Sequence, residues 1–190
     1  MQSKEVLRRL NSLHGIFYSV MNLMPRSTLI NLYHSLVYPC ITNNVIIWGG
    51  VSQVHVNKIK VLQNKILRCI LHVKFNDNYV PDIQTSHMYK ILNVLKFEDV
   101  HTYFILKFIH YCFYQNFNFF NTYFYNLLPN HNYSTRGTRI NLPQVRLDVE
   151  KQSALYQCCI LINEINQNLL LPQSNNLLKK TYFKQILDVY

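Results

Sequence analysis

Apolar side chains recur every three or four residues along most of this chain, and this period limits the fold more than any other feature. The clearest stretch runs from Val54 to His72, where the apolar residues fall on one face of a helix: Val56, Ile59, Leu62, Ile66, Leu67 and Ile70. Only four Gly and six Pro occur in 190 residues, so the turn signals that divide all-β chains are few. The sequence therefore predicts an all-α protein.

The N-terminal part is expected to form a helical, thumb-like bundle over residues 1–75. Ser3 stands before the first helical pattern as its expected N-cap, and Pro25 follows that pattern. A second pattern begins at Ser27, and Pro39 is expected to kink or end the helix that it forms.

A second helical part, a C-terminal extension, is expected over residues 76–190. Its helices are expected at about 86–95, from an N-cap at Asp99 onward, at 151–165 and at 175–189. An irregular loop is expected at about 129–146, where Pro, Asn, Ser and Gly gather. The aromatic residues of the helix that follows Asp99 have a spacing that favours burial over base stacking, because only Lys107 adds charge there.

The charge balance favours a polyanionic partner. Nineteen Lys and Arg stand against nine Asp and Glu, which gives a formal net charge of +10. Such a surplus suits nucleic acid or an acidic membrane surface. Neither of the two most apolar stretches, 27–57 and 108–128, offers the ~20 continuous apolar residues of a membrane span. Nucleic acid is therefore the expected partner, and no membrane span is expected.

Six basic side chains are the candidates for phosphate contacts. Three share one arc of the Val54–His72 helix and three surround the irregular loop: Lys58, Lys65, Arg68, Arg136, Arg139 and Arg146. Helix periodicity alone also fits a plain solvated face for the first three. No acidic residue on their helix pairs with them at four-residue spacing, which favours a phosphate-binding role.

Signatures of catalysis and of metal binding are missing from the sequence. The five Cys show no regular framework, which is typical of a reducing compartment, so an intracellular location, nuclear or cytoplasmic, is expected. Neither Cys nor His occurs in the close pairs that a zinc site needs. There is no Gly-rich phosphate loop, and carboxylates are too sparse for two-metal chemistry. We therefore expect no catalytic residue, no metal and no cofactor in this chain.

A series of short segments in fixed order gives the chain a resemblance to a known family. The segments are Leu32–Pro39 (Leu-Tyr-x-x-Leu-Val-x-Pro), Val45–Gly49 (an apolar run ending in Trp-Gly), Leu62–Ile70, Tyr89–Leu92 followed by Leu95 and Asp99, His131–Arg136 (His-x-Tyr-x-Thr-Arg) and Phe183–Leu187. Together they resemble the region downstream of the palm in reverse transcriptases of jockey-like non-LTR retrotransposons. The resemblance extends from about Leu7 to the C-terminus. It departs at Asn163–Asn166, which lacks the Pro common in the family.

The resemblance implies a thumb-like part that tracks the template–primer duplex, followed by a less understood C-terminal extension. It also implies that the polymerase catalytic site is absent from this chain, because the family's catalytic palm carries an Asp-Asp motif and this chain has no such pair. The expected function is thus that of a non-catalytic polymerase fragment that binds the backbone of RNA or an RNA–DNA hybrid. An active polymerase would require a palm encoded upstream.

Two other readings of the sequence stay open. The chain could be a helical protein-interaction module, or a decayed remnant that self-associates through an exposed apolar surface. The motif residues His131 and Tyr133 either order the loop or contact a ligand.

Overall fold

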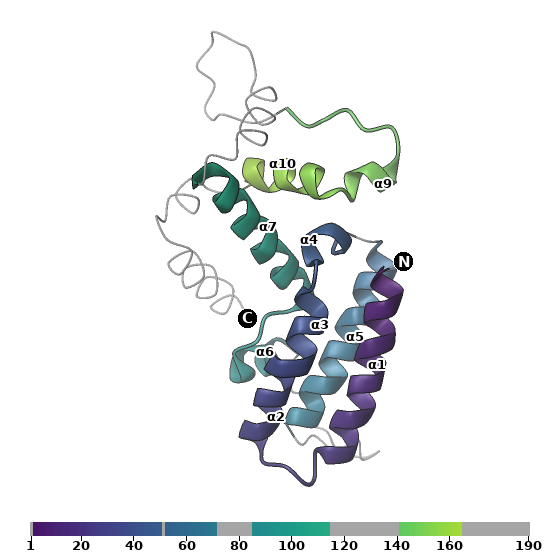
Figure 1. Ribbon diagram of the computed structural model, residues 1–190, viewed down its shortest axis with the longest axis vertical. Helices are drawn as coiled ribbons and strands as arrows, with labels where there is room; N and C mark the ends of the chain where they lie inside the picture. Colours follow the sequence, from purple (N-terminus) through teal and green to yellow (C-terminus); the bar gives the residue numbers. More distant parts are fainter. Residues whose placement is uncertain (1, 51, 72–84, 115–140, 165–190) are drawn as a thin grey trace. The chain divides into compact units, whose positions relative to one another are not determined.

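The computed structural model describes residues 2–50, 52–71, 85–114 and 141–164 (Figure 1). Every regular element within these ranges is a helix, which confirms the all-α prediction. The chain forms two compact units, and the division falls between His101 and Thr102. This differs from the expected boundary at residue 75, because segments after residue 85 complete the core of the first unit.

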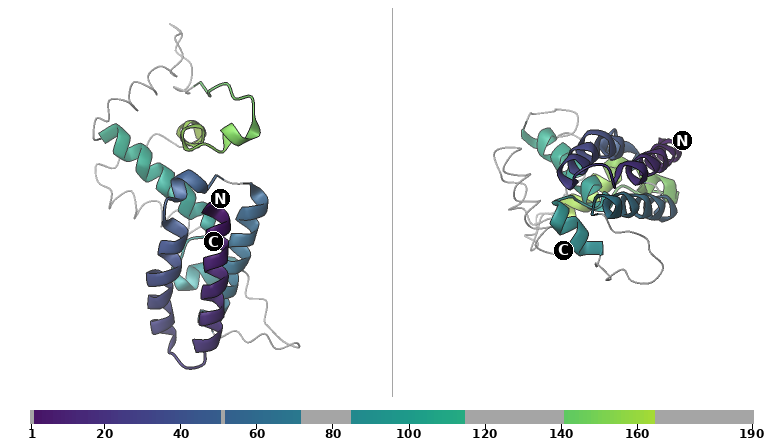
Figure 2. Two further views of the ribbon diagram at one scale, coloured as in Figure 1. Left: turned by 45° about the vertical axis from the view of Figure 1, so that its right-hand side comes forward. Right: turned by 90° about the horizontal axis from the view of Figure 1, so that it is seen from below.

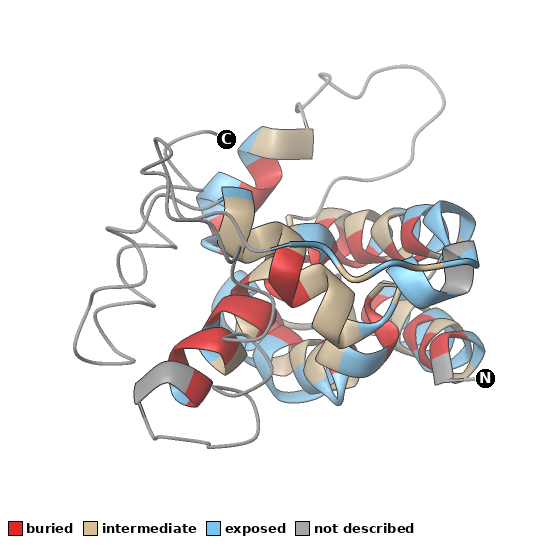
Figure 3. Cartoon of the chain, turned by 90° about the horizontal axis from the view of Figure 1, so that it is seen from above, coloured by how far each residue is buried: buried red, intermediate tan, exposed pale blue. Residues whose placement is uncertain are grey.

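Three long helical segments build the first unit. α1 (Gln2–Val20) and α5 (Gln53–Ile70) lie side by side and run in the same direction, as Figures 1 and 2 show. Between them in sequence, α2 (Arg26–Leu32), η1 (Tyr33–Val37) and α3 (Tyr38–Thr42) return in the opposite direction. Buried residues recur along each helix and alternate with exposed ones (Figure 3), as expected for amphipathic helices around one core.

Pro39 neither stops the returning helix nor leaves it regular. Proline has no N–H, and in a regular α-helix its ring would collide with the carbonyl of Ser35. The preceding turn, η1, is a π-helix, in which the N–H of Tyr38 donates to the carbonyl of Tyr33 five residues earlier. This wider turn accommodates the proline ring, and the helix continues to Thr42.

The inward face of α5 contains one polar side chain that the hydrophobic pattern did not predict. Gln63 is 0% exposed, whereas the neighbouring Leu62, placed on the predicted face, is only half-buried. The Gln63 amide nitrogen donates to the Tyr33 hydroxyl and to the Leu95 carbonyl, both at 2.9 Å. Its amide oxygen accepts the N–H of Phe97 at 3.1 Å. One side chain therefore joins α5, η1 and the segment that leads into α7 (Phe97–Tyr114).

Two further contacts attach this segment to the bundle. The hydroxyl of Tyr89, in α6 (Thr85–Leu92), donates to the Asn64 side-chain oxygen at 2.7 Å. The Trp48 ring, at the end of α4 (Val45–Trp48), stacks on the ring of Phe97 with centroids 5.3 Å apart. These residues lie on both sides of residue 75, so the core does not divide there.

Glycine is required at position 49. A Cβ built there would collide with the His101 ring. His101 is largely buried in this contact and its Nε2 has no hydrogen-bond partner. Burial lowers the pKa of His101 to about 4, so the ring is neutral near pH 7.

Both predicted N-caps are wrong. α1 already begins at Gln2, so Ser3 lies inside the helix, where it is buried. α7 begins at Phe97, and the N–H of Val100 bonds to the carbonyl of Lys96 at 2.9 Å, so Asp99 lies in the first turn. Burial raises the pKa of the Asp99 carboxyl to about 6.

The second unit contains the C-terminal portion of α7 with α9 (Asp148–Lys151) and α10 (Ala154–Glu164). α10 covers most of the helix expected at 151–165, and α9 is a separate short helix that precedes it. Cys158 and Cys159 pack against Ile105 and Ile109 of α7. Residues 141–146 of the expected loop are not helical, while residues 129–140 and the helix expected at 175–189 lie outside the described residues.

Replacing the buried amide of Gln63 tests its structural role. Gln63→Leu removes the partners of the Phe97 N–H and of the Leu95 carbonyl. Because an unpaired buried polar group costs about 1–3 kcal/mol, the free energy of unfolding should fall by about 3 kcal/mol in denaturant titrations. Gln53→Leu makes the same change at an exposed position of α5 and should have little effect. Equal effects of the two variants would contradict the assigned role.

Candidate nucleic-acid interface

Three of the predicted phosphate contacts share the solvent side of α5. Lys58 and Lys65 are exposed and Arg68 is half-buried, and we call these three residues the α5 ridge. With a rise of 1.5 Å per residue, Lys58 and Lys65 stand about 10 Å apart along the helix axis, and Arg68 about 5 Å further on. The ridge therefore presents cations along one side of one rigid element.

α1 adds two basic residues that the sequence analysis did not select. Lys4 and Arg8 line a groove between α1 and α5 together with Lys58. The apolar part of this groove is supplied by Leu7, Val61 and Leu62, and its volume is about 620 Å³. The sequence spacing could have identified these residues, because Lys4, Leu7, Arg8 and Asn11 fall on one face of a helix.

Acidic residues leave the ridge uncompensated. The first 71 residues contain eight Lys and Arg but a single carboxylate, Glu5. Glu5 accepts hydrogen bonds from Arg8 at 2.9 and 2.8 Å and from Arg9 at 2.9 Å. These two guanidinium groups lower the pKa of Glu5 to about 2.

The neighbouring cation on α5 is neutralised. Lys60 pairs with Glu98 at 2.5 Å, on a different side of the helix from the ridge. Among the residues that the structure describes, no carboxylate pairs with Lys58, Lys65 or Arg68. The positive charge of α5 is thus concentrated on the ridge.

The environment of His14 in α1 includes the charge of Lys65 in α5. The Nε2 atom of His14 is buried without a hydrogen-bond partner. Burial lowers the pKa of His14, and the nearby charge of Lys65 lowers it further. Lys65 of α5 therefore lies close to His14 of α1.

Of the other three predicted contacts, Arg146 alone lies among the described residues. Arg146 is exposed in the second unit, and its backbone N–H donates to a Glu150 carboxylate oxygen at 2.8 Å. Arg136 and Arg139 lie outside the described residues, as do His131 and Tyr133. Within the described residues, the predicted contacts that share one element are Lys58, Lys65 and Arg68.

The described residues offer little for catalysis. They contain no group of three or more His, Cys, Asp or Glu side chains that could hold a metal ion. Four of the five cysteines are buried, and Cys40 is half-buried. Burial raises the pKa of Cys158 to about 12, which keeps that thiol protonated and unreactive at neutral pH. Within the same residues, none of the helices combines the length and the apolar character that crossing a membrane requires.

No family model matches this chain, and neither does any curated protein or solved structure. The resemblance to reverse transcriptases consequently has its support in the sequence segments. It stays a prediction from the sequence.

The junction of α1 and α5 can be tested through His14. Lys65→Gln removes a positive charge beside the imidazole, so the pKa of His14 should rise, as followed by NMR titration of its ring protons. Lys90→Gln, which removes an exposed charge on α6, serves as the control and should leave His14 unchanged. A pKa of His14 that does not respond to Lys65→Gln would contradict the proximity of Lys65 to His14.

Proposed function

We propose that this chain is a non-catalytic piece of a retrotransposon RNA-directed DNA polymerase that binds the phosphate backbone of RNA or an RNA–DNA duplex. The observation that carries the proposal is the concentration of uncompensated positive charge on the α5 ridge and the adjoining α1. Proteins that neutralise phosphates release condensed counterions, and this release drives binding that does not depend on sequence.

The geometry supports positioning rather than base reading. Lys58 and Lys65 reach from one rigid helix on flexible stems and act as point charges, which suits phosphate oxygens along a backbone. Base reading would need side chains that contact base edges within a groove, and no groove-reading motif occurs in the sequence. The ridge would hold a strand in register without selecting its sequence.

The same proposal excludes nucleotide incorporation by this chain. Polymerase chemistry relies on carboxylates that hold metal ions, and the sequence contains no Asp-Asp pair. The role proposed for the chain is therefore binding, and any polymerisation would depend on residues that it does not supply.

Binding should depend steeply on salt and on the ridge. We expect the protein to bind a labelled 20-base-pair RNA–DNA hybrid in fluorescence anisotropy, more weakly as salt rises from 50 to 200 mM. The double variant Lys58→Gln/Lys65→Gln removes two phosphate contacts, so the slope of log affinity against log salt should become shallower by about 2. Affinity at low salt should fall by about tenfold or more.

The matched control has the same net charge as the ridge double variant. Arg26→Gln/Lys90→Gln also removes two exposed basic side chains from the first unit, away from the ridge. This variant should keep most of the affinity. Equal losses in the two double variants would show that binding follows net charge alone, and absence of binding at 50 mM salt would remove the proposal.

A second candidate function, a helical protein-interaction module that self-associates or binds another protein, has one specific observation in its favour. Several apolar side chains are exposed on α1 and α5, including Val61 at 52% and Tyr18 at 60%. Exposed apolar surface of this kind is typical of protein contacts when it is contiguous. This candidate gains if the ridge variants leave nucleic-acid binding unchanged.

A further inference from the structure

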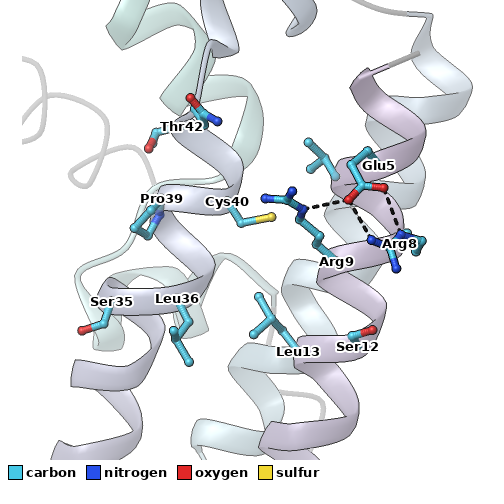
Figure 4. A pocket seen from close by; sticks show the side chains of 12 residues that line it. Glu5, Arg8, Arg9, Ser12, Leu13, Ser35, Leu36, Pro39, Cys40 and Thr42 are labelled. Atoms are coloured by element: carbon cyan, nitrogen blue, oxygen red, sulfur yellow. Dashed lines mark hydrogen bonds and ion pairs between the residues drawn. The ribbon is translucent and has the colours of Figure 1, made fainter.

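The three helical segments of the first unit leave grooves between them, and these grooves differ in what occupies them. The groove beside α5 and η1 is filled by the chain itself, through the segment that Gln63 binds. The groove between α1 and α5 carries the basic residues described above. The third, between α1 and η1–α3, is an open pocket of about 750 Å³ (Figure 4), a size typical of small-molecule sites.

The walls of this third pocket combine apolar and polar side chains. α1 contributes Val6 and Leu13, and the returning helix contributes Leu36 and Pro39. Leu36 lies in the π-turn and is 42% exposed, so its side chain is available to a ligand without any rearrangement. Ser12 and Thr42 add hydroxyl groups to the lining.

Arg9 brings a cation to these walls. Its Nε donates to the Glu5 carboxylate at 2.9 Å, and that bond leaves the terminal nitrogens of the guanidinium unused. In Figure 4 the terminal nitrogens point across the pocket toward Cys40. A guanidinium held in this way offers paired donors to a carboxylate.

The local charge favours an anion. Glu5 is ionised and is shared by Arg8 and Arg9, so the three side chains together carry one net positive charge. Burial raises the pKa of the Cys40 thiol, which therefore faces Arg9 as a neutral, polarisable group rather than as a competing anion. A ligand with one negative charge would complete the balance.

We propose that the pocket between α1 and η1–α3 binds a small organic carboxylate with an apolar body. The carboxylate accepts hydrogen bonds from the terminal nitrogens of Arg9, and the body lies against Leu13, Leu36 and Pro39. Arg9, Leu13, Leu36 and Pro39 do not belong to the α5 ridge, although Arg8 lines both this pocket and the groove between α1 and α5.

Octanoate is a suitable probe for the whole chain. Titrated into ¹⁵N-labelled protein, it should shift the backbone amide signals of Leu36 and Cys40 in a saturable way. Arg9→Gln should weaken binding by about tenfold or more, since a hydrogen bond to a charged group is lost. Arg26→Gln, which removes an exposed arginine outside the pocket, is the matched control and should bind octanoate as the unmodified protein does.

Two further ligands test which part of octanoate is recognised. Octanol lacks the charge and should bind about tenfold more weakly or worse. Octyl phosphate carries up to two charges, and tighter binding of this compound than of octanoate would overturn the assignment of a carboxylate. Equal affinity for octanol and octanoate would overturn it as well, as would the absence of saturable shifts.

A second variant and a second readout keep the test independent of the folding of Arg9→Gln. Leu36→Glu places a negative charge at an exposed position of the wall and should abolish octanoate binding. The single Trp of the chain reports on the same pocket, because the Trp48 indole N–H donates to the carbonyl of Asn43, a lining residue, at 2.7 Å. A change in Trp48 fluorescence that saturates with the NMR shifts supports the site. Unweakened octanoate binding by Leu36→Glu contradicts it.

Discussion

The buried amide of Gln63 is the interaction on which the first unit depends. A fully buried amide without partners would oppose folding, because its donors and acceptor lose their bonds to water. Here both are satisfied, by Tyr33 from η1 and by the backbone of Leu95 and Phe97. Only one arrangement of these three segments meets all the bonds at once. The amide thus adds geometric specificity to the less directional packing of apolar side chains.

This arrangement decides which surfaces remain available. The segment bound by Gln63 lies beside α5 and η1, and two open grooves of the described residues flank α1. Arg8 lines both of them. Glu5 binds Arg8 and Arg9 and leaves Lys4, Lys58 and Lys65 without a carboxylate partner among the described residues. One side of α1 therefore adjoins the uncompensated ridge, and the other adjoins a pocket with one net positive charge.

Helical period predicted the fold class and α5, because burial of an amphipathic face depends mainly on local spacing. It could not predict Gln63, since a polar residue between apolar ones is normally assigned to solvent, and its partners lie about thirty residues away on either side. The N-caps predicted at Ser3 and Asp99 are wrong. Both helices begin before the residue that carries the cap signal, at Gln2 and at Phe97.

The candidate interface could be predicted only in part. The ridge lies on one helix, so the spacing of Lys58, Lys65 and Arg68 sufficed to place it on the solvent side of α5. Lys4 and Arg8 lie beside the ridge because α1 packs on α5. The spacing of residues within either helix does not predict that packing. The pocket beside Arg9 depends in addition on the π-turn. The sequence led us to expect a kink or an end of the helix at Pro39, and it did not indicate a π-turn before it.

The protection of the Phe97 N–H from hydrogen exchange tests the account most directly, because this group donates to the Gln63 amide. If that bond holds the first unit together, the Phe97 amide should exchange only through global unfolding, with the same free energy as the buried helix amides of α5. Exchange of the Phe97 amide at a rate near that of an unstructured peptide would show that the segment opens independently, and would contradict the account.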